Sequence, residues 1–249
     1  MIKANKSKPV LYRSYLSAES AVKGIQASKK NALRLFEDSR TLFGKKRYAT
    51  ACALSILAIE EATKPAIIRK IVLANSSAEL KRGWQLFACH IDKINPWIIP
   101  HLIKETKTHV DFIEQFMRKK NPILLDSIKQ LSFYVGCHGK AHWSDPAIIV
   151  NESLANSVIN NAAILIMSGQ LTNIDTLKGI ELWKEHMQGL FSTGYARANE
   201  MIIEYFKKAK TLKIFSDEND IPKETAFDFM TTALVLGDGE AREQKDIFK

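Results

Sequence analysis

The segment from residue 51 to residue 74 constrains the fold most strongly, because it is of helix length and apolar on nearly every side. A helix that lacks a polar face has to be surrounded by other elements. Only Glu60, Glu61 and Lys64 interrupt it in the middle, and on helical spacing Glu61 falls within an apolar stripe. Because an unpaired buried charge is costly, we expect these carboxylates to have partners.

Two interpretations of this polar insert are open. Lys64 follows Glu60 by four residues and Glu61 by three, which is the order in which helical ion pairs form. One interpretation is therefore an ion pair within the helix that orients two helices. The other is a polar pocket between helices, lined by Glu61 and Lys64, because titratable groups in such pockets are often functional.

The composition favours an all-α fold. Of the 249 residues 46% are apolar, whereas only 11 are glycine and 7 are proline, and alternating apolar and polar runs between turn pairs are scarce. Pro65 is expected to kink its helix without ending it. Helical periodicity predicts helices at 17–43, 45–74, 77–94, 97–119 and 123–133, one from Asn151 or Asn156 to 169, and a long one at 175–206.

Charge and composition divide the chain into three parts. We expect a basic N-terminal arm at 1–16, a helical domain at 17–212, and an acidic tail at 213–249 that is partly disordered or forms one short helix at 222–236. The net charge of +9 consists of −5 on residues 214–249 and +14 on the remainder. A basic body can attract RNA, although solubility alone explains dispersed lysines more simply.

The cysteines and the N-terminus indicate a cytoplasmic protein. Cys52, Cys89 and Cys137 are odd in number and widely spaced, which fits no disulfide framework. The first residues lack the apolar core of a secretory signal. No uncharged apolar run reaches the length of a membrane span, so we expect no contact with membranes.

The segment YVGCHGKAHWSDP at 134–146 is the least helical part of the body and concentrates reactive side chains. Its Cys137, His138, His142 and Asp145 are donors suited to zinc, but glycines flank His138 and no second ligand motif is present, so we predict no metal site. Nucleotide-binding and nucleophile-elbow motifs are also missing, and we predict no cofactor.

Cleavage of RNA without a metal ion is compatible with this segment. It needs a base for the ribose hydroxyl and cations or hydrogen-bond donors for the phosphate. His138 or His142 would serve as the base with Lys64 as a catalytic cation, and Tyr134 and Lys140 would bind the substrate.

The predicted helix at 77–94 carries a further pair of binding candidates. His90 and Lys93 are three residues apart and share one face. A lone histidine on a mostly apolar helix is more commonly a core residue, and both interpretations are open.

Three sequence elements together resemble the AbiV family of abortive-infection proteins, within the HEPN superfamily of helical bundles. They are KRYATACALSILAIEEATK, CHIDK and FYVGCHGKAHWSDP. The most specific part is the A-x-E-E-x-x-K core with Glu60, Glu61 and Lys64, followed by the Tyr-Val and Trp-x-x-Pro elements that begin at Tyr134 and Trp143. The resemblance covers roughly residues 25–170.

The resemblance implies a HEPN-like helical bundle, here with an additional C-terminal helix and the acidic tail. It also implies a bacterial antiphage protein of the cytoplasm, a homodimer that a phage protein triggers and that blocks phage multiplication by arresting translation or another host process. Many HEPN relatives are ribonucleases with an arginine followed after four to six residues by a histidine. No arginine occupies that window before His138 or His142, and seven residues separate Arg82 from His90.

Two mechanisms follow. In the first, which the missing arginine–histidine pair favours, the protein binds a phage or host partner through the 134–146 segment, while Glu61 and Lys64 hold the fold. In the second, it is a metal-independent ribonuclease that uses His138, His142 or His90 with Lys64 in a dimer cleft. Both lead us to expect the acidic pair and Lys64 to face the segment that bears Tyr134 and Trp143.

Overall fold

The computed structural model describes residues 11–90, 93, 122–170, 175–190 and 195–214. The first ten residues of the expected basic arm, the helices expected at 97–119 and 222–236, and the acidic tail after residue 214 lie outside the described residues.

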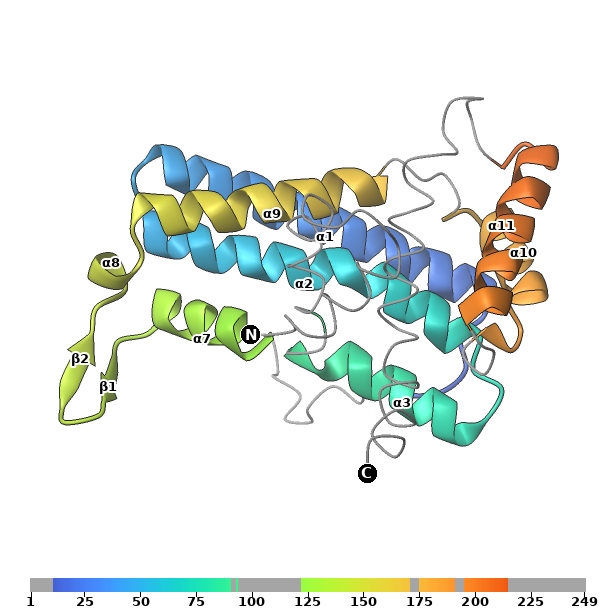
Figure 1. The fold of residues 1–249 in the computed structure, drawn as a ribbon, viewed down its shortest axis with the longest axis horizontal. Coiled ribbons are helices and arrows are strands. Elements are labelled where there is room, and N and C mark those ends of the chain that lie inside the picture. The colour runs from blue at the N-terminus through green and yellow to red at the C-terminus, as the bar shows by residue number, and fades with distance from the viewer. Residues whose placement is uncertain (1–10, 91–92, 94–121, 171–174, 191–194, 215–249) are drawn as a thin grey trace, which may run out of the picture.

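A pair of long antiparallel helices, α1 (Ala18–Gly44) and α2 (Tyr48–Val72), forms the centre of the bundle (Figure 1). Ser17 caps α1 by accepting a hydrogen bond from the Ser20 amide at 3.2 Å, as its sequence position predicts. α2 continues through Pro65 without a break. Both observations confirm the helices predicted for this part of the chain.

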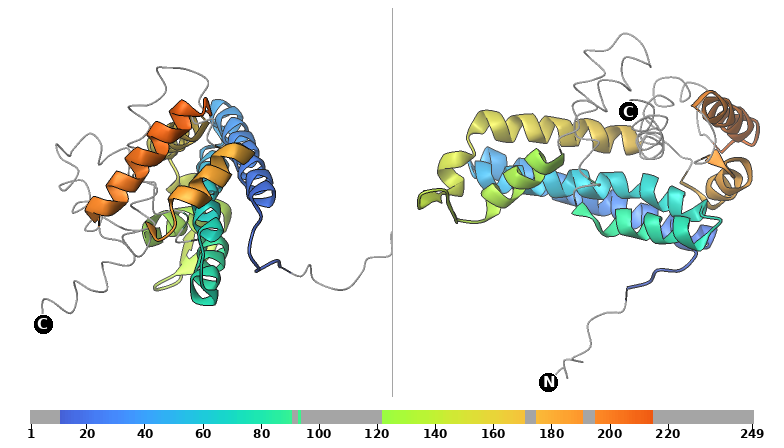
Figure 2. Two further views of the ribbon diagram at one scale, coloured as in Figure 1. Left: turned by 90° about the vertical axis from the view of Figure 1, so that its right-hand side faces the viewer. Right: turned by 60° about the horizontal axis from the view of Figure 1, so that its bottom comes forward.

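Other helices cover the sides of α2 that α1 leaves open. α9 (Glu152–Gln170) lies along α1 and α2, and α7 (Pro122–Phe133) packs against the N-terminal half of α2 (Figures 1 and 2). The shared core contains Ile56 and Ile59 of α2 together with Leu125 of α7 and Ala162 of α9. This surrounding layer explains why the sequence of α2 has no polar face.

α3 (Ser77–Ala88) packs against the C-terminal half of α2. It ends earlier than the predicted 77–94 helix, because Cys89 has an extended backbone with φ −76° and ψ 123°. Its N-cap is Ser76 and not Ser77, since the Ser76 hydroxyl accepts from the Glu79 amide at 3.2 Å. The interruption at Cys89 redirects the chain immediately before His90.

The segment expected to be a loop contains a short antiparallel hairpin, β1 (Gly136–His138) and β2 (His142–Ser144). Gly139 and Ala141 have positive φ values of 54° and 64° in its turn. Figure 1 shows the hairpin projecting beyond the end of the bundle where α1 turns into α2. The short helix α8 (Pro146–Ile149) leads from it to α9.

The long helix predicted at 175–206 is instead two helices, α10 (Leu177–His186) and α11 (Tyr195–Thr211). α10 ends at His186 with Met187 as its C-cap, and Gly189 has a positive φ of 78° that does not continue a helix. Thr176 caps α10 by accepting from the Gly179 amide at 3.1 Å, so α10 begins two residues later than the predicted helix. The two helices lie together at one end of the bundle (Figure 2).

None of the helices in the described part of the chain is both long enough and apolar enough to cross a membrane.

Candidate functional site

The buried carboxylate of Glu60, only 3% exposed, joins α2 to two other segments. Its Oε1 accepts a hydrogen bond from Nζ of Lys129 on α7 at 2.6 Å. Its Oε2 lies 2.7 Å from Nδ1 of His90, directly after α3. Glu60 therefore brings together a lysine and a histidine that are far apart in the sequence.

His90 is held from one side and open on the other. Its side chain is 63% exposed although Nδ1 contacts Glu60. An ionised carboxylate only accepts hydrogen bonds, so we infer that Nδ1 carries the proton of the neutral ring and that Nε2 is the basic nitrogen. The ring geometry directs Nε2 away from Glu60. The interpretation of His90 as a core histidine is therefore wrong.

Lys129 keeps a positive charge within the cluster. It is 5% exposed, and its Nζ also lies 2.8 Å from Oδ1 of Asp126. Burial lowers the pKa of Lys129, but the hydrogen bonds to Asp126 and Glu60 outweigh burial and raise the pKa above its ordinary value. Lys129 is therefore an ammonium at neutral pH and supplies a positive charge beside Glu60.

Lys93 is a second buried lysine beside the same carboxylate, 5% exposed. Its main-chain carbonyl accepts from the Thr63 hydroxyl of α2 at 2.9 Å, which fixes this part of the chain against α2. Burial lowers the pKa of Lys93, an effect that the Glu60 charge opposes and the Lys64 charge reinforces. Lys93 consequently releases its proton more readily than an exposed lysine does.

Glu61 forms the expected ion pair with Lys64, at 2.6 Å between Oε1 and Nζ. The ammonium of Lys64 also lies 5.2 Å from the centre of the Phe87 ring on α3. The side chain of Glu61 is 19% exposed, however, so Glu60 and not Glu61 is the acid on the fully buried face. A helix with apolar residues all round does not reveal from its sequence which side faces outward.

The hairpin residues do not join this cluster. Figure 1 places the hairpin past the bundle end from which α2 starts, whereas α3, which leads to His90, packs on the other half of α2. Tyr134, His138, Lys140, His142 and Trp143 are all exposed. Within one chain, the expectation that Glu61 and Lys64 face this segment is therefore wrong. A joint site of Lys64 and the hairpin histidines in a dimer cleft stays a prediction.

Within the hairpin, His138 and His142 are directly opposite each other across the strands. Nε2 of His138 lies 3.3 Å from Oγ of Ser144, which also accepts from the Gly136 amide at 2.8 Å. Across the described ranges, no three histidine, cysteine or acidic side chains gather as ligands for a metal ion. The hairpin arranges its polar groups among themselves rather than toward the bundle.

A second buried charge cluster lies near the other end of the bundle. Asp175 pairs with Arg69 of α2, at 2.5 Å between Oδ1 and the guanidinium, and with Lys29 of α1. Burial alone would raise the pKa of Asp175, but Arg69 and Lys29 outweigh it and lower the pKa below its ordinary value. All three charges are engaged with one another, so this cluster ties α10 to the bundle.

One comparison with known proteins is decisive. The family model described as HEPN_AbiV: AbiV matches residues 20–167. The matched region runs from α1 into α9 and contains Glu60, His90, Lys93 and Lys129 as well as the hairpin. The chain belongs to the AbiV family. No curated protein and no solved structure gave a match to the chain.

Membership of the AbiV family implies a role in abortive infection, which is a defence against phage. The region specific to this family is the helical bundle with the hairpin, whereas α10 and α11 follow it in the sequence. The Glu60 cluster therefore belongs to the AbiV part of the molecule.

Sequence reasoning missed Lys129 and Asp126 of this AbiV bundle as site residues. A signal was present, because Leu125, Lys129 and Ser132 are spaced as one helical face and all three are buried. A lysine on the apolar face of a helix requires an acidic partner, as Glu60 requires a cationic one. Considering α2 and α7 together would have suggested the Glu60–Lys129 pair.

Proposed function

We propose that this chain acts in abortive infection by cleaving RNA without a metal ion, with His90 as the general base. The observation that carries the proposal is the pairing of Nδ1 of His90 with buried Glu60 at 2.7 Å, while the histidine side chain is 63% exposed. A carboxylate that holds one ring nitrogen fixes the tautomer and leaves the other nitrogen available to act as a base. This is the arrangement required for removing a proton from a bound hydroxyl.

The proposed reaction has one proton acceptor and one proton donor. Nε2 of His90 takes the proton of a ribose 2′-hydroxyl, the 2′ oxygen forms a bond to phosphorus, and the bond from phosphorus to the 5′ oxygen breaks. Lys93, whose pKa burial lowers, supplies the proton that the leaving 5′ oxygen needs. The products are a 2′,3′-cyclic phosphate and a 5′-hydroxyl, and exchange with water restores both side chains.

The lysines supply the positive charge that phosphate cleavage needs. Lys129 is held by Glu60 and Asp126, and Lys64 by Glu61. These ion pairs fix the ammonium groups without an arginine at the usual HEPN spacing. We propose that the lysine cluster performs the role that arginine has in other HEPN ribonucleases.

The test is an incubation of purified protein with total RNA and transfer RNA, with and without EDTA. We expect cleavage in both conditions, and a loss of about 10²- to 10⁴-fold in rate in His90→Ala, the usual contribution of general acid–base catalysis. His142→Ala is the matched control, since it removes an exposed histidine of the hairpin. Equal rates in His90→Ala and wild type would contradict the proposal.

A second candidate function rests on the exposed hairpin. Tyr134 is 64% exposed, Trp143 75% and Ile148 of the adjoining α8 80%. Contiguous exposed apolar side chains mark interaction sites. In this alternative, the surface binds a phage or host protein and arrests translation by that contact, and a second copy of the chain is a further candidate occupant that would make the protein a homodimer.

Phage protection assays separate the two functions. If binding through the hairpin is the mechanism, Trp143→Ala abolishes protection, whereas His90→Ala retains it. If RNA cleavage is the mechanism, His90→Ala abolishes protection. Sedimentation of wild type and Trp143→Ala shows whether the same surface forms a dimer.

A further inference from the structure

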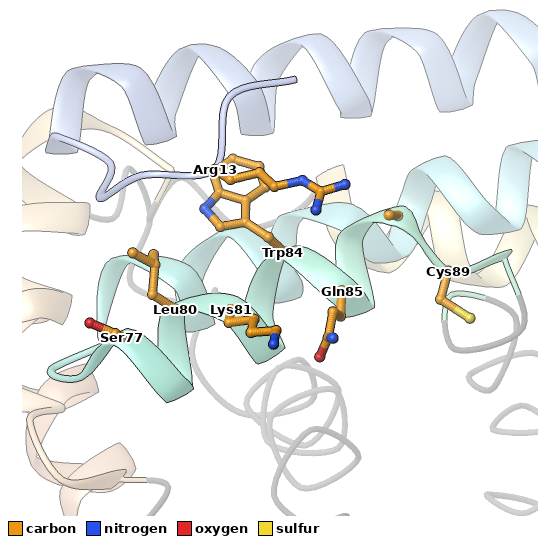
Figure 3. A pocket seen from close by; sticks show the side chains of 8 residues that line it. Arg13, Ser77, Leu80, Lys81, Trp84, Gln85 and Cys89 are labelled. Carbon is orange, nitrogen blue, oxygen red and sulfur yellow. The ribbon is translucent and has the colours of Figure 1, made fainter. Parts of the chain in front are cut away.

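A cleft of about 530 Å³ runs along α3 and the segment before α1. This volume is within the range of small-molecule sites, about 300–1,000 Å³. The lining residues are Arg13, Ser77, Leu80, Lys81, Trp84, Gln85, Ala88 and Cys89. Figure 3 shows the guanidinium of Arg13 extending beside Trp84, with Lys81, Gln85 and Cys89 along the helix.

The charge of the cleft suits an anion. Two of its lining residues, Arg13 and Lys81, are exposed cations, and none of the lining residues is acidic. No acidic group of the described residues forms an ion pair with either cation. An electropositive cleft without its own counter-charges attracts phosphate groups.

Arg13 is held at the cleft by its neighbours. The indole Nε1 of Trp84 donates a hydrogen bond to the Ser14 carbonyl at 3.0 Å. The ring of Tyr12 packs edge-on against Trp84, with 6.0 Å between the ring centres. Because residues on both sides of Arg13 are fixed to Trp84, the cation stays near an aromatic ring, which is the combination that binds single-stranded nucleic acid.

The cleft leads to the proposed catalytic histidine. From Ser77 to Cys89 the helix axis extends about 18 Å at 1.5 Å per residue, which is long enough to lie beside a short single strand. Cys89 is one end of the lining, and the next residue is His90. The lining of the cleft therefore ends one residue before the proposed catalytic histidine, which is not itself a lining residue.

We propose that this cleft is a binding subsite for single-stranded RNA, with Arg13 and Lys81 on the phosphates and Trp84 against a base. The inference rests on the proposed ribonuclease function, since it supplies the strand that His90 acts on. It adds Arg13, Lys81 and Trp84 to the residues of the Glu60 cluster.

The experiment measures binding of a fluorescein-labelled oligouridylate by fluorescence anisotropy, with the full chain in a His90→Ala background so that the RNA stays intact. We compare Arg13→Ala/Lys81→Ala with Lys23→Ala/Lys30→Ala, which removes two exposed charges from α1 instead. We expect the cleft variant to bind at least about fivefold more weakly. The slope of log affinity against log salt should fall by about 1.4, which is 0.7 for each lost phosphate contact, whereas the α1 variant changes little.

Two further measurements make the result specific. Trp84→Leu should also weaken RNA binding at least about fivefold if a base stacks on the indole. Circular dichroism reports whether this variant folds. If Trp84→Leu does not fold, the Arg13→Ala/Lys81→Ala variant, which changes only exposed residues, tests the subsite. Unlabelled polyglutamate should compete poorly. Equal weakening of RNA binding in the two double variants would overturn the subsite proposal. Competition by polyglutamate as strong as that by unlabelled oligouridylate would also overturn it.

The outcome is separable from that of the proposed function. If wild type cleaves no RNA but the cleft variant alone loses binding, the ribonuclease proposal fails and the RNA subsite remains. If wild type cleaves RNA and both double variants bind RNA alike, the ribonuclease proposal remains and the cleft is not the subsite.

Discussion

At the scale of single residues, the carboxylate of Glu60 has two roles. Oε1 neutralises Lys129, which is 5% exposed, and Oε2 orients His90, whose side chain is 63% exposed. The first contact concerns stability, since removing Glu60 leaves the buried Lys129 with Asp126 as its one remaining ion-pair partner among the described residues. The second concerns chemistry. Substitutions can separate these roles, because only the first depends on Lys129.

The stability role predicts a large effect of Glu60→Gln. We expect the free energy of unfolding to fall by about 1–3 kcal/mol, because Lys129 loses the more deeply buried of its two carboxylate partners in the described part of the chain and keeps Asp126, and urea unfolding measures the loss. Glu61→Gln, in the more exposed pair, should cost about 1 kcal/mol or less. The double variant Glu60→Gln/Lys129→Met should recover more than about 1 kcal/mol of the loss. A Glu60→Gln variant as stable as wild type would contradict this role.

The three cysteines should differ in reactivity by their surroundings. Burial raises the pKa of the Cys52 thiol to about 11, whereas Cys137 is exposed on the hairpin. We expect Cys137 to react at once with a disulfide reagent at pH 8 and Cys52 only after unfolding. Absorbance of the released thiolate follows the reaction. The fast phase should disappear in Cys137→Ser, and rapid labelling of Cys52 in the native protein would show that its site opens.

At the scale of elements, helices on all sides position α2, whereas a close contact between Gly83 and Ile71 positions α3. A Cβ at Gly83 would lie 2.7 Å from Cγ1 of Ile71, which is 1% exposed and has no space to move. Since the chain passes from α3 through Cys89 to His90, the depth at which α3 packs decides where the histidine lies. The packing at Gly83 therefore affects the position of His90.

This close contact predicts that Gly83→Ala is destabilising. We expect a loss of about 1–3 kcal/mol from overpacking, reduced by up to about 1 kcal/mol because alanine favours the helix. Gly44→Ala is the control, because no atom lies within 4 Å of a Cβ there. Thermal unfolding of both variants decides the point. If Gly83→Ala unfolds at a temperature as high as Gly44→Ala does, the contact is not tight in solution.

At the scale of the whole molecule, a buried charge cluster ties α10 to the family-specific bundle. Asp175 precedes α10, whereas its partners Lys29 and Arg69 belong to α1 and α2. α10 and α11 lie beyond the region that matches the AbiV family. The bundle therefore holds its C-terminal addition partly by one buried acid.

The lowered pKa of Asp175 makes this attachment dependent on pH. The contribution of a carboxyl group whose pKa is lowered on folding is complete above its ordinary pKa, here 3.8, and is lost as the pH falls below that value toward the folded pKa. We expect Asp175→Asn to lower the free energy of unfolding at pH 7. The difference from wild type should shrink at pH 3. Asp38→Asn, in an exposed pair, should have little effect at either pH. A difference that does not change with pH would exclude ionisation as the cause.

The sequence by itself determined the all-α class, the two long helices that became α1 and α2, the capping of α1 by Ser17 and the AbiV resemblance, because periodicity, capping residues and motif spacing are local properties of the chain. It also indicated that the acids of α2 need partners. Only the tertiary structure decided that Glu60 is the buried acid, that Lys129 and His90 are its partners, and that the hairpin lies elsewhere. Lys129 is 69 residues from Glu60 in sequence. Contacts over such separations depend on how helices are rotated and packed, which a helix that is apolar on all sides does not encode locally.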